Sequence, residues 1–256
     1  MPYRGGPRAR RALAAMILAT LTLAACGRGG GLLKPEYEYE EELYLSLDGT
    51  ATLNVNASAA ALVALRGADL PVDPRARLDR ERVKALFQGS ESQAVVTLSR
   101  RDGRRFVHVR VDVADVEELQ RLAPLAWSSY RFNRQGEAFT YRQTVGASTG
   151  KTVSDVGWTG AELVAFRIHV PSEIIYHNAP SKKTERGNIL EWEQPLSERL
   201  NGSPVAIEID MEPESILSQT LLLFGSTIIA AAVMFGIVIW WVARRGRDPK
   251  IAESQP

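Results

Sequence analysis

The chain has 256 residues, of which 45% are hydrophobic and 24% are charged, and its formal net charge is +1. These values are ordinary for a globular protein, but basic residues gather at the ends, four before residue 12 and four after residue 243. The middle keeps a small acidic excess. This argues against a nucleic-acid-binding protein, because that class needs a basic face to replace phosphate counterions.

The first 25 residues have the layout of an export signal. Four arginines precede an apolar stretch over residues 12–25, which is too short to cross a ~30 Å hydrocarbon core comfortably. The stretch ends in Leu23-Ala24-Ala25-Cys26, which resembles the bacterial lipobox, whose cysteine thiol takes up a lipid and becomes the first mature residue. Cys26 is the only cysteine of the sequence, and lipidation would account for a thiol without a disulfide partner.

We therefore expect a lipoprotein signal peptide over 1–25, lipidation at Cys26, and a glycine-rich flexible tether over 26–31. An ordinary signal peptide, or an uncleaved anchor with an accidental cysteine, is the alternative.

The other end of the chain reads as a membrane span. Residues 221–243 form an apolar run without a charged side chain, and at ~1.5 Å per residue it reaches ~34 Å. Trp240 and Trp241 stand at one end of the run, where indole rings prefer the headgroup level, and arginines follow at once. We expect a transmembrane helix over 217–243 rather than a buried core helix.

By the positive-inside rule the tail over 244–256 is expected in the cytoplasm. The body would then lie outside the cytoplasm, on the bacterial cytoplasmic membrane.

The body, residues 32–215, reads as one extracytoplasmic α+β domain. Strands are expected over 37–47 and 50–56 around an Asp48-Gly49 turn, and helices over 59–66, capped by Ser58, and over 79–88. Next come strands over 94–99 and 105–113, a helix after the capping residue Asp115, and strands over 130–132, 138–145, 163–170, 174–177, 189–192 and 205–211. Consecutive strands joined by short turns predict an antiparallel sheet with two or three packed helices.

The segment before the span has a distinctive order of residues. It reads Val170-Pro171-Ser172-Glu173-Ile174-Ile175, then His177-Asn178-Ala179, then residues 186–192, Pro195-Leu196, and the strand over 205–211. This order resembles the LppM-type lipoprotein domain, a family of unknown function with a lipobox, an α+β ectodomain and a C-terminal span. The resemblance is clearest over 163–245. It implies an exported, membrane-tethered domain that engages lipids or envelope components, with no catalytic residues to carry over.

Candidates for catalysis or metal binding are few. His108 and His169 alternate with apolar residues in expected strands, which favours ordinary strand positions with a hydrogen-bonded partner, and His177 lies in a turn beside Asn178. The histidines lack the HxH or HExxH spacing of a zinc site, and no G-x-S-x-G elbow is present. The sequence predicts no cofactor, no metal and no enzymatic activity, with an enzyme of unrecognised site as the remaining alternative.

Other segments suggest ligands only superficially. Residues 146–152 look like a phosphate loop but are one residue short of GxxxxGK[ST], and 197–199 read as loose polar loop residues. The acidic run over 36–42 hints at calcium, but its alternation favours the solvated edge of a sheet. Trp127, Trp158 and Trp192 are expected to be core or rim anchors, or together to line an apolar pocket.

The leading hypothesis is a non-enzymatic, membrane-anchored lipoprotein whose ectodomain binds an envelope ligand, with a lipid or glycolipid as first choice, because both ends hold the domain at the bilayer. Its alternative is a structural or assembly protein that binds another envelope protein. The expected partners are therefore the lipid bilayer and either a lipid ligand or an envelope protein, and not nucleic acid. The lipid site is expected in a cleft between sheet and helices, lined by Leu62, Val63, Leu65, Val83, Leu86 and Phe87.

Overall fold

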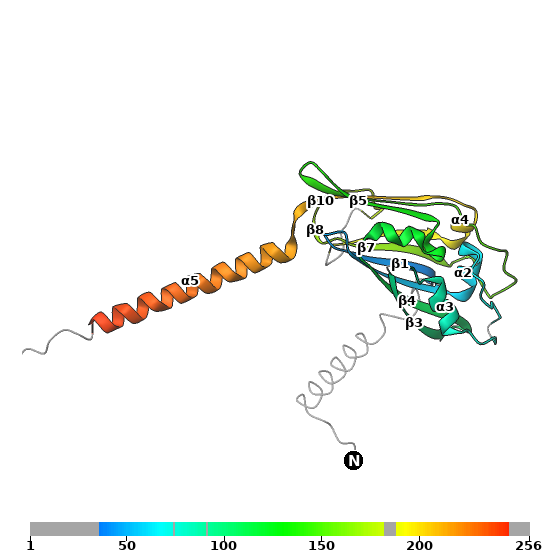
Figure 1. The fold of residues 1–256 in the computed structure, drawn as a ribbon, viewed down its shortest axis with the longest axis horizontal. Helices are drawn as coiled ribbons and strands as arrows, with labels where there is room; N and C mark the ends of the chain where they lie inside the picture. The colour runs from blue at the N-terminus through cyan, green and yellow to red at the C-terminus, as the bar shows by residue number, and fades with distance from the viewer. Residues whose placement is uncertain (1–35, 74, 91, 182–187, 246–256) are drawn as a thin grey trace, which may run out of the picture. The chain divides into compact units, whose positions relative to one another are not determined.

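The computed structural model describes residues 36–73, 75–90, 92–181 and 188–245. The predicted signal peptide, Cys26 and the tether lie outside the described residues, as does the tail after Arg245. From Tyr37 onward the chain builds two β-sheets, short helices beside them, and one long C-terminal helix (Figure 1). The predicted α+β class with a C-terminal apolar helix is confirmed.

The larger sheet has six strands in the order β3-β4-β2-β1-β7-β9. In that order the strands are Ser92–Arg101, Arg104–Val113, Ala51–Ser58, Tyr37–Leu45, Leu163–His169 and Ile189–Pro195. Neighbours pair antiparallel except β1 and β7, which are parallel. The expected antiparallel sheet thus contains one parallel pair, which a chain can form only after a long crossover.

That crossover contains two of the four strands of a second sheet, which has the order β5-β6-β10-β8 and is antiparallel throughout. Its strands are Ser128–Gln135, Ala138–Val145, Val205–Ser215 and Ser172–His177. The chain changes sheet between β7 and β8 at Pro171, whose nitrogen has no hydrogen to continue a strand ladder. One expected sheet is therefore two.

The helices follow their local signals. In α2 (Ala59–Arg66), the Ser58 hydroxyl accepts from a backbone N–H of the first turn, and the helix ends at Gly67 with φ at 66°. α3 covers Arg80–Leu86. The helix expected after Asp115 is instead two 3-10 helices, η1 (Val116–Arg121) and η2 (Ala123–Leu125), since Pro124 cannot continue an α-helix. The single turn α4 (Leu196–Leu200) was not expected.

The sequence suggested that the acidic run of β1 lies at the solvated edge of a sheet, and this prediction was wrong. β1 is an interior strand between β2 and β7. Glu38 and Glu41 are buried, whereas Glu40 and Glu42 are half-buried on the outer face of the sheet. The acidic side chains therefore lie on both faces of an interior strand, and each face offers them polar partners.

Glu41 accepts four hydrogen bonds in the core between the sheets. The donors are the hydroxyls of Tyr39 at 2.5 Å and Tyr130 at 3.3 Å, the indole of Trp127 at 3.4 Å and the amide of Gln143 at 3.4 Å. Burial raises the pKa of Glu41, and the bonds from Tyr39, Trp127 and Tyr130 act in the opposite direction. The carboxylate thereby links the larger sheet to the smaller one.

The glycine-rich loop after β6 closes the C-terminal end of α2. The Ser148 hydroxyl donates to the Leu65 carbonyl at 3.1 Å. The backbone N–H groups of Thr149 and Lys151 donate to the carbonyls of Leu65 and Val63. These bonds satisfy carbonyls that the end of a helix leaves without partners. The loop therefore caps α2, although its glycines superficially resemble those of a phosphate-binding loop.

The chain enters and leaves the sheets at opposite ends. Near the start of β1, the ring of Tyr39 packs 5.3 Å from that of Trp127. Beyond the other end of β1, Leu47 and Phe139 line the same hollow. Phe139 pairs with Met211, near the end of β10, after which the long helix begins.

This long helix, α5, covers Ile216–Arg245. In the described part of the chain, the segment Thr220–Arg244 is the one helix long and apolar enough to cross a membrane. Its large apolar side chains are 48–74% exposed. An apolar surface of this extent requires a covering phase such as lipid, and the alternative of a buried core helix is wrong.

Replacing Glu41 with glutamine should change the pH dependence of stability. Because the folded-state pKa of Glu41 is raised above its unfolded value, its stabilising contribution is present at low pH and is lost as pH rises through the folded-state pKa. The Glu41→Gln variant lacks this loss. Its free energy of unfolding should therefore increase relative to the native chain as pH rises above about 4, the usual pKa range of a glutamate carboxyl.

Urea unfolding of the full chain in detergent micelles, followed by near-UV circular dichroism, measures this difference. Glu137→Gln, which removes an exposed carboxylate, reports the effect of net charge alone. A difference that stays constant or decreases with pH would contradict the assignment.

Replacing Gly150 with alanine should loosen the cap of α2. An added Cβ would lie 1.8 Å from the carbonyl oxygen of Ala64, so the backbone of the loop or of the helix must move. Overpacking of this kind costs about 1–3 kcal/mol, measurable as a lower midpoint of chemical unfolding. The exposed neighbouring change Thr152→Ala should cost less than about 0.5 kcal/mol; equal effects of the two variants would argue against the close approach.

Candidate functional site

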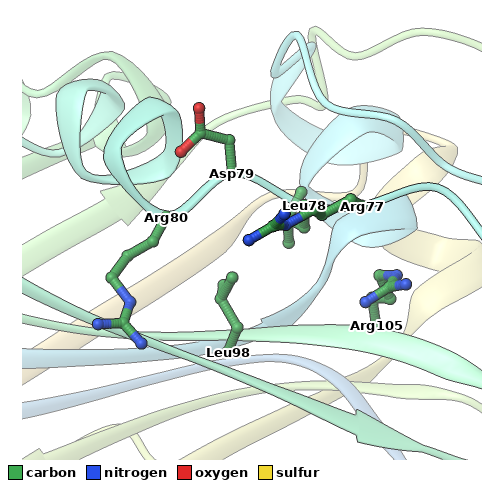
Figure 2. Close-up of a pocket in the computed structure, with 6 residues that line it drawn as sticks. All are labelled: Arg77, Leu78, Asp79, Arg80, Leu98 and Arg105. Atoms are coloured by element: carbon green, nitrogen blue, oxygen red, sulfur yellow. The ribbon is translucent and has the colours of Figure 1, made fainter.

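An open hollow of about 710 Å³ lies where α3 packs on β3, one of the two edge strands of the six-stranded sheet (Figure 2). We call it the arginine hollow. Its lining consists of Arg77, Leu78, Asp79, Arg80, Leu98 and Arg105.

The start of α3 holds two of these arginines in place. Asp79 caps the helix by accepting a hydrogen bond from a backbone N–H of the first turn at 2.9 Å. Leu78, just before the cap, and Val83, in the first turns, are both buried, which is the arrangement of a hydrophobic staple. Arg77 and Arg80 stand on either side of Leu78 and the capping residue Asp79 in the sequence, and both arginines are exposed.

The sheet supplies the rest of the hollow. Leu98 of β3 is partly buried against the core, and Arg105 comes from β4. Figure 2 shows Leu98 among Arg77, Arg80 and Arg105, with the carboxylate of Asp79 turned away from them. The hollow therefore combines three guanidinium groups with an apolar floor.

The charge of the hollow is poorly compensated. Within the described ranges, neither Arg77 nor Arg80 forms an ion pair, whereas the neighbouring Arg82 pairs with Asp69. Guanidinium groups in such a position attract anions and form paired hydrogen bonds with phosphate or carboxylate oxygens. This basic site stands out on a domain whose sequence is mildly acidic.

The apolar cleft predicted from the sequence is not formed by the residues named for it. Leu62, Val63, Leu65, Val83 and Phe87 are each at most 7% exposed and belong to the core, and Leu86 is partly buried against it. α2 and α3 pack directly on the sheet, so these side chains fill the space that the cleft would need. The prediction of this lining was wrong.

The three tryptophans are core or rim anchors, as expected, and none lines the arginine hollow. Trp127 and Trp192 are buried and Trp158 is partly buried. Their indole N–H groups donate to three different partners: that of Trp127 to Glu41, that of Trp192 to Asn178 and that of Trp158 to Glu38.

The histidines occupy the strand and turn positions expected of them. His169 on β7 contacts Glu42 at 2.7 Å and stacks on the ring of Tyr44 at 3.9 Å. His177, at the end of β8, accepts from a backbone N–H at 3.2 Å. His108 lies on β4 and contacts a serine and an asparagine. The described residues contain no group of three metal-binding side chains; that the chain holds no metal stays a prediction.

Arg199 is a buried cation that sequence reasoning missed. It is fully buried on α4, where its guanidinium donates to backbone carbonyls, including that of Gly146 at 2.5 Å. The guanidinium carbons of Arg199 and Arg66 lie 4.7 and 4.5 Å from the ring centre of Trp127. Residues 197–199 are therefore part of a helix and not loose loop residues. Nothing in the sequence indicated this helix, because a single turn is too short to show a helical periodicity.

No protein-family model matches the sequence, and no curated protein matches it. Among solved structures, the fold is similar to the NMR structure of the folded domain of LppM from Mycobacterium tuberculosis. The match has 12% sequence identity, covers 73% of this chain and 95% of that chain, and has a TM-score of 0.37. This match is to the kind of domain that the sequence resembles, and it assigns neither an activity nor a ligand to this chain.

Proposed function

We propose that this chain is an exported lipoprotein of the bacterial envelope, and that its domain binds the anionic headgroup of an envelope lipid or glycolipid in the arginine hollow. The observation that carries the proposal is the hollow itself. Three guanidinium groups surround Leu98 there, and two of them have no described ion-pair partner.

The chemistry of the hollow favours binding of an anion over a reaction. Its lining contains no histidine, cysteine or serine that could act as a base or nucleophile. Guanidinium groups match phosphate geometry with paired N–H donors, and the apolar floor suits the glycerol or acyl end of a headgroup. That the chain is not an enzyme stays a prediction.

The anchors proposed for the domain support a ligand from the membrane. The exposed apolar helix α5 would span the cytoplasmic membrane, with the arginines after it on the cytoplasmic side and the domain outside. A lipid on Cys26 would hold the other end of the domain at the same bilayer.

The alternative, binding to another envelope protein, has one observation in its favour. β8 lies at the edge of the four-stranded sheet, and its side chains Ile175 and Tyr176 are 59% and 48% exposed. A strand of a partner can extend such an edge. A defined protein adduct through β8 after crosslinking in intact cells, together with an unchanged lipid content, would favour this alternative.

The double variant Arg77→Gln/Arg80→Gln should bind anionic headgroups more weakly. Each lost charged hydrogen bond is worth about 1.5–3 kcal/mol, which corresponds to roughly tenfold or more in Kd. Calorimetric titration of the full chain in uncharged detergent with glycerol 3-phosphate, beside inorganic phosphate, measures the change. Arg82→Gln, whose side chain pairs outside the hollow, is the matched control and should keep native affinity.

Tighter binding of glycerol 3-phosphate than of inorganic phosphate would identify a headgroup, and mass spectrometry should then find anionic lipid enriched in the native protein over the double variant. Equal binding by the native chain and the double variant would rule out the arginine hollow as the site.

Intact mass spectrometry tests the second anchor. The membrane-extracted native chain should begin at Cys26 and carry a diacylglyceryl and an acyl group, and a Cys26→Ser variant should lose both, because the thiol is the atom that is lipidated. An unmodified native mass would leave α5 as the one proposed anchor and would weaken the case for a lipid ligand over a protein partner.

A further inference from the structure

A separate polar cluster lies on the outer face of the six-stranded sheet, where β3, β4 and β2 are neighbours. His108 on β4 is directly opposite Thr97 of β3 and Asn56 of β2. Ser99 is two residues beyond Thr97 on β3, so it lies on the same face. Ser99 is exposed, whereas His108 and Asn56 are half-buried.

These three side chains form a continuous chain of hydrogen bonds. The Oγ atom of Ser99 lies 2.7 Å from Nε2 of His108, and Nδ1 of His108 lies 2.8 Å from Oδ1 of Asn56. The amide nitrogen of Asn56 donates in turn to a carboxylate oxygen of Glu40 at 3.4 Å.

The direction of each hydrogen bond follows from what each atom can do. A carboxylate oxygen only accepts, so the Asn56 amide turns its nitrogen toward Glu40 and its oxygen toward His108. An amide oxygen also only accepts, so Nδ1 of His108 carries the proton and Nε2 has a free lone pair. The Ser99 hydroxyl must then donate to Nε2.

The carboxylate of Glu40, with which this chain of hydrogen bonds ends, is itself held in place. Glu40 forms an ion pair with Arg167 of β7, and the Arg167 Nε donates to Glu191 of β9 at 2.6 Å. The row of contacts thus extends across all six strands from Ser99 to Glu191. This row holds the imidazole in one tautomer with its basic nitrogen on the serine.

Space beside His108 and the charge of Arg101 suit a small electrophile that approaches the exposed Ser99. A shallow hollow of about 190 Å³ adjoins His108 and is lined in part by Val95 and Thr97. Arg101 follows Ser99 by two residues on the same face of β3, with its guanidinium carbon 4.1 Å from the ring centre of Phe106. Burial and the charge of Arg101 lower the pKa of His108, so the imidazole is neutral, and able to accept a proton, at neutral pH.

We propose that Ser99 is a nucleophile toward esters with small acyl groups, with His108 as its base and Asn56 as the residue that positions the imidazole. A nucleophile, a base within hydrogen-bond reach and a third group that orients the base make up the arrangement that activates a serine hydroxyl. This activity would be separate from binding in the arginine hollow.

The reaction has two steps with water as the second reactant. Ser99 Oγ attacks the ester carbonyl carbon while its proton passes to Nε2 of His108. The bond from that carbon to the alcohol oxygen breaks, and the leaving alcohol takes the proton from His108. Water, deprotonated by His108, then attacks the acyl–Ser99 ester, and Ser99 regains its proton as the carboxylic acid is released.

A fluorophosphonate reagent, which forms a covalent bond with activated serines, tests the proposal on the full chain in detergent micelles. Peptide mass spectrometry should find the label on Ser99 and not on Ser129, an exposed strand serine without a described hydrogen bond to histidine. His108→Gln should slow labelling by about 100-fold or more, the usual contribution of a general base.

The role of Asn56 requires its own pair of variants. Asn56→Asp keeps an oxygen that accepts from Nδ1 and should keep labelling, whereas Asn56→Leu should lose most of it while near-UV circular dichroism shows a native fold. Labelling of Ser99 no faster than of Ser129, or labelling undiminished by His108→Gln, would overturn the proposal; specific labelling would also correct the prediction that the chain is not an enzyme.

Discussion

The buried carboxylate of Glu41 is the contact on which the packing of the two sheets depends. A carboxylate inside a protein is costly unless hydrogen bonds and nearby charge compensate it. Its donors come from β1 of the larger sheet and from β5, β6 and the residue before β5 on the side of the smaller sheet. Trp127 is one donor, and Arg66 of α2 and Arg199 of α4 lie against its ring. Displacing one sheet along the other would therefore break bonds to the carboxylate and separate both helices from the tryptophan.

Features with local causes were predictable from the sequence. The cap at Ser58, the stop at Gly67 and the turn at Asp48-Gly49 each act within a few residues, and α2 and the first hairpin form where they were expected. The parallel pairing of β1 with β7 and the burial of the acidic run depend on partners far along the chain, such as Arg167. The arginine hollow depends likewise on α3 packing against a strand, and no spacing within residues 77–105 indicates that contact.

β3 connects the two sites described above. Successive residues of a strand point to opposite faces of its sheet, so Leu98 forms the floor of the arginine hollow while Ser99 lies on the outer face. An anion held by the arginines and an ester held beside Ser99 would therefore be separated by the thickness of one strand. Leu98 is half-buried and Ser99 is exposed, so both faces are accessible at this point of β3.

The entry and exit of the chain at opposite ends of the sheets would limit how the two proposed anchors could share one bilayer. The ten residues over 27–36 reach at most about 35 Å when fully extended, and the nine residues of β1 extend over about 30 Å. With a lipid on Cys26 and α5 in the same membrane, that segment must either stretch along most of the length of the sheets or allow the strands to lie along the membrane surface. The second arrangement would turn an entire side of the domain toward the headgroups, so that ligands could be drawn directly from the leaflet without first passing through water.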